Sequence, residues 1–65
     1  MSYTVDVYIG EDNYVHFDEN KLEDFIDVYN QAVIAEKVDF TFEANVFTVE
    51  FAKYVIEFVQ TNLPK

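Results

Sequence analysis

The apolar and polar residues of the chain follow two different periods, and the changes between them divide it into six segments. In residues 3–9 every second residue is apolar or aromatic, which is the period of a half-buried strand. Residues 10–13 hold the only glycine and have the composition of a hairpin turn, and residues 14–17 predict a short return strand. Val15 and Phe17 are expected to point inward with the odd-numbered residues of the first strand.

The longest periodic segment, residues 18–37, has the 3.6-residue period of an amphipathic helix. Its apolar side is predicted to contain Leu22, Phe25, Ile26, Val28, Tyr29, Ala32 and Val33. Asp18 is a suitable N-cap, and Phe17 can form a hydrophobic staple with the first turn. Because no Gly or Pro follows the segment directly, we expect the helix to end near Ala35 or Glu36, where β-favouring residues take over.

The second half of the chain repeats the order of strand, strand and helix. Residues 38–43 alternate, which predicts a strand, and residues 46–49 predict its return partner. The inward positions of the first of these strands are expected to be Val38, Phe40 and Phe42. Residues 44–45 are expected to form a tight turn, because Asn45 tolerates the left-handed backbone that such a turn needs.

A second helix is predicted to reach Asn62, but the pattern leaves its start open. Thr48 is a candidate N-cap, whereas residues 47–51 also alternate and could continue the strand. The apolar arc of this helix covers about 200°, which is wider than a helix lying on one sheet needs. The arc contains Phe51, Ala52, Tyr54, Val55, Ile56, Phe58, Val59 and Leu63. The helix therefore either lies deep between the sheet and the first helix or forms a dimer seam.

The order ββαββα predicts a single α+β domain over residues 1–65. We expect a four-stranded, mainly antiparallel sheet with both helices packed on one face. The two helices can be aligned at an offset of 30 residues, which matches Asp18 with Thr48 and Phe25 with Val55. A ββα pseudo-repeat explains this match, and so does chance agreement between two amphipathic helices.

Composition adds a strong negative charge to this fold. The chain has 13 Asp and Glu residues against 4 Lys and Arg, which gives a net charge of −9. This charge argues against direct binding to nucleic acid or to an anionic membrane, and it favours a basic protein partner. It would also keep a chain with seven Phe and five Tyr soluble, which is the simpler explanation. Without a secretory signal or a long apolar stretch, a cytoplasmic protein is expected.

The chain contains few groups that support catalysis or metal binding. It has no Cys, and its single serine, Ser2, is poorly placed to form a nucleophilic triad with its single histidine, His16. His16 lacks the further imidazoles or thiolates of a zinc site and is expected on the outer side of its strand. Glu11 and Asp12 suit a turn better than they suit a calcium loop. We therefore expect no enzyme, no metal and no cofactor.

The acidic side of the first helix is the most distinctive cluster of the sequence. It is formed by Glu19, Glu23, Asp24 and Asp27, and the pairs that lie four residues apart repel each other. Carboxylates spaced in this way can imitate the charges of a nucleic-acid backbone. In size and composition, though in no motif, the chain resembles the small acidic inhibitors of phages and mobile elements, which include DNA mimics.

These observations lead to two hypotheses. In the first, the protein is a small acidic binding module that inhibits or regulates a basic nucleic-acid-processing protein by occluding it. The charged contact would be formed by Glu19, Glu23, Asp24 and Asp27, with Tyr8 and Tyr14 as aromatic anchors. In the second, it is a structural or homodimeric domain whose acidic surface serves solubility only.

Overall fold

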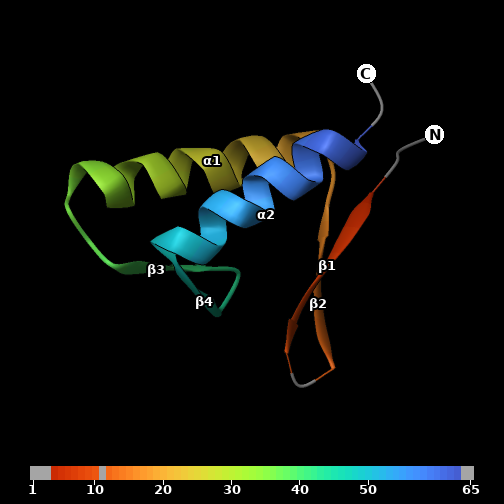
Figure 1. Ribbon diagram of the computed structural model, residues 1–65, viewed down its shortest axis with the longest axis horizontal. Coiled ribbons are helices and arrows are strands. Elements are labelled where there is room, and N and C mark those ends of the chain that lie inside the picture. The colour runs from red at the N-terminus through yellow and green to blue at the C-terminus, as the bar shows by residue number, and fades with distance from the viewer. Residues whose placement is uncertain (1–3, 11, 64–65) are drawn as a thin grey trace.

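The computed structural model describes residues 4–10 and 12–63 and contains four strands and two helices (Figure 1). The elements are β1 (Val5–Gly10), β2 (Asn13–Phe17), α1 (Glu19–Ile34), β3 (Asp39–Phe42), β4 (Asn45–Thr48) and α2 (Val49–Asn62). The predicted order ββαββα and the α+β class are therefore confirmed. Ser2, Tyr3 and Glu11, which entered the predictions above, lie outside the described residues.

The four strands form two separate antiparallel hairpins, so the prediction of one four-stranded sheet is wrong for the described residues. Among the described residues, β1 pairs only with β2, and β3 pairs only with β4. Alternation along a strand determines which of its sides is buried, but it does not determine which strands pair. The ring of Phe17 on β2 stacks on that of Phe42 on β3, with centroids 6.3 Å apart, so side chains rather than backbone hydrogen bonds join the hairpins.

The two helices lie side by side and cover the hairpins from one side (Figure 1). α1 contacts β2 and β3, while α2 contacts β1 and β4. Each helix thus packs against one strand of each hairpin, and the two-layer arrangement of helices on strands is retained without a continuous sheet. A duplicated ββα unit stays a prediction.

The core is built around the ring of Phe25, which is fully buried on α1. This ring lies within 5.0–5.5 Å, between centroids, of the rings of Phe17, Phe40, Phe42 and Phe47, which come from three strands. Most of these contacts are edge-to-face, the arrangement that aromatic quadrupoles favour. The buried residues are Val5, Val7, Val15, Phe17, Leu22, Phe25, Ala32, Phe40, Phe47, Ala52, Val55 and Val59.

Both predicted N-caps are present. The Asp18 carboxylate accepts a hydrogen bond of 2.7 Å from the backbone N–H of Lys21, and the Thr48 hydroxyl accepts one of 3.1 Å from that of Phe51. α2 therefore begins directly after Thr48, and the alternative of a continued strand over residues 47–51 is wrong. A side-chain oxygen at this position satisfies a backbone N–H that the first turn leaves without a partner.

α1 ends at Ile34 with Ala35 as its C-cap, which confirms the predicted position of the helix end. The next residue, Glu36, has left-handed backbone although it is neither Gly nor Asn. Glu36 has φ of 58°, its N–H donates to the carbonyl of Val33, and the N–H of Lys37 donates to the carbonyl of Ala32. These two hydrogen bonds form a Schellman motif, which satisfies carbonyls of the last turn.

Three local predictions are wrong. The tight turn between β3 and β4 falls on Glu43 and Ala44, with φ of 50° and 66°, whereas Asn45 belongs to β4 and donates its side-chain amide to the Glu43 carbonyl. Val33 is 46% exposed because the last turn of α1 extends past α2 (Figure 1). Val38 precedes the strand at a bend and is 79% exposed instead of pointing inward.

Candidate functional site

The acidic side of α1 is a continuous exposed face. The four predicted contact residues Glu19, Glu23, Asp24 and Asp27 are all exposed. Within the described part of the chain, none of them forms an ion pair with a cation, and only Asp27 accepts a side-chain hydrogen bond, at 3.4 Å from Gln31. Lys21, the nearest cation in the sequence, instead places its ammonium group 3.1 Å from the Glu43 carboxylate. The negative charge of this face is therefore left uncompensated by the described residues.

The predicted aromatic anchors lie together on the outer side of the first hairpin. Tyr8 and Tyr14 are opposite each other in the β1-β2 register, and their rings meet edge-to-face with centroids 5.3 Å apart. Both remain more than half exposed. Next to them, His16 and Asp6 are also opposite each other, and the imidazole pairs with the carboxylate on the open surface. The expected outward position of His16 is thus confirmed.

A row of aromatic rings continues this surface from Phe47 on β4 along α2. The sequence predicted the helical part of this row only as deeply buried or as a dimer seam. The rings of Phe47, Phe51, Tyr54 and Phe58 stack one after another, with centroids 6.2–6.3 Å apart and planes within 10–29° of one another. Phe51, Tyr54 and Phe58 are 36%, 60% and 39% exposed. The wide apolar arc predicted for this helix was the feature of the sequence that indicated these exposed rings. Among the described residues no element covers the excess width of this arc, and Phe51, Tyr54 and Phe58 are not deeply buried.

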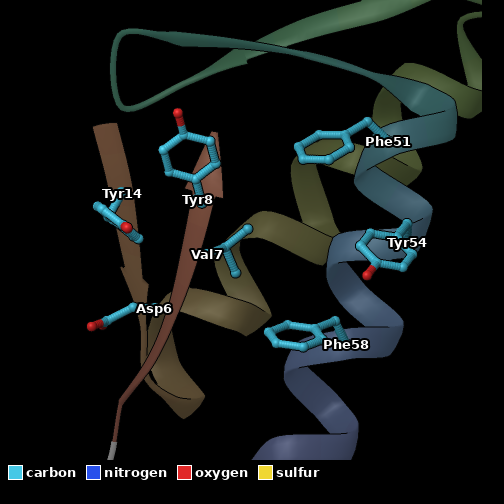
Figure 2. Close-up of a pocket in the computed structure, with 7 residues that line it drawn as sticks. All are labelled: Asp6, Val7, Tyr8, Tyr14, Phe51, Tyr54 and Phe58. Atoms are coloured by element: carbon cyan, nitrogen blue, oxygen red, sulfur yellow. The ribbon is translucent and has the colours of Figure 1, made fainter. Parts of the chain in front are cut away.

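Between the first hairpin and α2 these side chains line an open groove of about 280 Å³ (Figure 2). We call it the aromatic groove; its lining residues are Asp6, Val7, Tyr8, Tyr14, Phe51, Tyr54 and Phe58. Phe51 and Phe58 project from α2 toward the hairpin, and Val7 points from β1 toward α2 (Figure 2). No residue of α1 lines the groove. The structure therefore brings Tyr8 and Tyr14 together with α2, and it places the four acidic residues of α1 on a second surface.

The described residues offer no group of three or more His, Asp or Glu side chains that could hold a metal ion. Residues 4–10 and 12–63 also include no helix that is long and apolar enough to cross a membrane. The chemistry available on this surface is recognition by carboxylates and aromatic rings.

Comparison with known proteins adds no assignment: no family model, curated protein or solved structure matches this chain. The candidate site rests on the geometry alone.

Proposed function

We propose that this protein is a small acidic binding module without catalytic activity. In the cytoplasm it would inhibit or regulate a basic nucleic-acid-processing protein, in the manner of phage and mobile-element inhibitors, by covering the surface that binds nucleic acid. The observation that carries this proposal is the exposed face of α1, on which four carboxylates have no cationic partner among the described residues.

The spacing of these carboxylates supports imitation of a nucleic-acid strand. Glu19, Glu23 and Asp27 follow one another at intervals of four residues, and Asp24 lies beside them. From Glu19 to Asp27 the helix rises about 12 Å, so the face carries about one charge per 4 Å of its axis. One strand of duplex DNA carries a phosphate per about 3.4 Å of axis. A groove that neutralises phosphates with Lys and Arg would meet a similar density of negative charge on α1.

Repulsion within the face supports the same proposal. Like charges four residues apart destabilise a helix by a few tenths of a kcal/mol for each pair, and Glu23 belongs to two such pairs. A basic surface that contacts the face would relieve this repulsion, so part of the binding free energy would come from the strained charge distribution of the free protein. Long-range attraction by the net charge of −9 would also accelerate the encounter.

The test is capture of partners from host lysate on the wild-type protein and on Glu23→Lys/Asp27→Lys, which raises the net charge by four. The matched control is Asp39→Lys/Thr41→Lys/Gln60→Lys, which also raises it by four (2 + 1 + 1) at exposed positions outside α1. The proposal requires that the captured protein binds duplex DNA or RNA, is released by that nucleic acid and by added salt, and is lost from the α1 variant only. Equal capture by both variants would exclude α1 as the contact.

The alternative that we propose is a homodimeric or structural domain whose carboxylates only maintain solubility. The observation that favours it is the strong exposure of Ile34, Val38 and Val46, at 82%, 79% and 70% of their surfaces. Exposed aliphatic side chains of this size are candidates for burial against a second copy. Sedimentation at two protein concentrations separates the cases: a mass of two chains that persists on dilution supports this alternative, and a single-chain mass rejects the dimer.

A further inference from the structure

We propose that the aromatic groove binds a short, extended, arginine-bearing segment of a basic protein. This inference rests on the proposed function, because it names the part of the basic partner that the groove would receive. It assigns a role to α2 and to the first hairpin, whereas the charged contact proposed above uses only α1.

The stacked rings of α2 suit a flat cationic group. Phe51, Tyr54 and Phe58 present neighbouring rings whose planes differ by 29° and 19°, and all three are partly exposed in the groove. The face of an aromatic ring attracts a cation within about 6 Å of its centroid. A guanidinium group is planar and weakly hydrated, so it stacks on such a ring more readily than an ammonium group does. Arginine is therefore the favoured cation for this wall.

The charges around the groove have the complementary sign. Asp6 is one of its lining residues. On α2, with 100° between successive residues, Glu50 and Glu57 lie about 40° and 60° from Tyr54, on the side away from the core. Lys53 lies about 100° from Tyr54, farther from the rings than either carboxylate. Glu50 and Glu57 thus flank Tyr54 on the side opposite Phe51 and Phe58, and the Asp6 carboxylate pairs with the His16 imidazole. Among the described residues, the carboxylates beside the groove outnumber the single lysine, which favours a cationic ligand over an anionic one.

The dimensions of the groove limit the ligand to a short segment. From Phe51 to Phe58 the axis of α2 rises about 10 Å, and an extended chain covers that distance with about three residues. A second copy of this chain is the less favourable occupant, because each copy carries a net charge of −9 and docking would bring two negative surfaces together.

The test compares two capped tripeptides of equal charge, triarginine and trilysine, as ligands for the full chain. Calorimetry gives their affinities at low and moderate salt, and NMR identifies the side chains whose ring resonances shift. We expect triarginine to bind more tightly, by about two- to fivefold for each stacked guanidinium, with shifts of the Tyr54 and Phe58 ring signals. Equal affinities of the two peptides for the wild-type protein would overturn the proposal.

Two variants keep this test independent of folding. Tyr54→Leu and Phe58→Leu each remove a π face from an exposed position while retaining an apolar side chain, and each is expected to reduce the preference for triarginine. The matched control is Glu23→Lys/Asp27→Lys, which should weaken both peptides equally and leave their ratio unchanged. A ratio that falls in the control but survives both leucine variants would place the peptide on α1 and refute binding in the groove.

The outcomes also separate this inference from the proposed function. A basic partner captured through α1, together with no preference for triarginine, would refute the groove and leave the proposed function standing. A triarginine preference that depends on Tyr54, without any captured nucleic-acid-binding protein, would support the groove and count against the proposed function. Sedimentation of the free protein as a dimer with the Tyr54 and Phe58 rings protected would assign the groove to a second copy and overturn the inference.

Discussion

The ammonium group of Lys21 lies 3.1 Å from the carboxylate of Glu43, so the cation in the first turns of α1 is directed to the turn between β3 and β4. The pair is partly exposed, and surface ion pairs of this kind contribute about 0–1 kcal/mol to stability. Its greater consequence is for the charge on α1. Because Lys21 pairs with another element, it forms no ion pair with Glu19, Glu23, Asp24 or Asp27.

We predict that neutralising Glu23 stabilises the fold. Glu23→Gln removes two repulsive pairs on α1, with Glu19 and with Asp27, and each pair is worth a few tenths of a kcal/mol. Urea denaturation should therefore give a slightly larger free energy of unfolding for the variant. Glu57→Gln is the control, because Glu57 follows Lys53 by four residues and its neutralisation removes an attraction. Equal gains in both variants would contradict local repulsion on α1.

The same repulsion predicts a dependence on salt. Ions screen interactions between exposed charges, so the thermal midpoint of the wild-type protein should rise from low to moderate ionic strength. The rise should be smaller for Glu23→Gln, which carries less repulsion to screen. Circular dichroism melts at matched pH measure both midpoints. A wild-type midpoint that falls as salt is added would show that attractive pairs dominate the surface instead.

Truncation of Phe25 should cause the largest loss of stability. The Phe25 ring is fully buried and touches four other rings, so Phe25→Ala leaves a cavity at the centre of the core. Such substitutions destabilise proteins by about 3–5 kcal/mol, which is a large part of the stability expected for a domain of this size. The control Phe58→Ala removes a ring that is 39% exposed and should be milder. Chemical denaturation of the two variants compares them directly.

Glycine at position 44 should stabilise the second hairpin. Ala44 has φ of 66°, is exposed and lies in the turn between β3 and β4, where left-handed backbone disfavours a side chain. Ala44→Gly should raise the free energy of unfolding by roughly 0.5–1 kcal/mol. Ala35 offers the matched control, since it is exposed with φ of −81° and gains nothing from glycine. Stabilisation by Ala35→Gly as well would point to an effect other than turn geometry.

Loss of the second cap should destabilise α2. Thr48→Ala removes the hydroxyl that accepts from the Phe51 N–H and should lower the free energy of unfolding by about 1 kcal/mol. Thr48→Ser keeps a hydroxyl that accepts this hydrogen bond, so this variant should retain most of the wild-type free energy of unfolding. Thr61→Ala, at an exposed position near the other end of α2, is the control and should change little. An alanine variant as stable as the serine variant would exclude a capping role.

The element order could be predicted because its signals are local. Asp18 and Thr48 act within three residues along the chain, and the change from a two-residue to a helical period occurs directly after each of them. The pairing of the strands could not be predicted, since Phe17, Phe40, Phe42 and Phe47 have the same inward positions in one sheet or in two hairpins. The turn between β3 and β4 was predicted one residue too late, at residues 44–45 instead of 43–44, because Glu43 is not a residue type that favours the left-handed backbone that it adopts there.

For the candidate site, the sequence placed each group on the correct side of its own element. Tyr8 and Tyr14 were expected on the outer side of the first hairpin, and the acidic residues on the outer side of α1. That Tyr54 would face the same groove as Tyr8 depends on how α2 sits beside β1, which is a tertiary relationship without a local signal. The division of the candidate residues between two surfaces followed only from that packing.

The separation of the hairpins has a consequence for how the molecule opens. Among the described residues no backbone hydrogen bond connects β1-β2 with β3-β4, so their ladders can break independently of each other. What makes their opening cooperative is the ring cluster around Phe25, which touches three of the four strands. Amide exchange should therefore give one common free energy of opening for the two hairpins in the wild-type protein and two distinct values once that cluster is loosened.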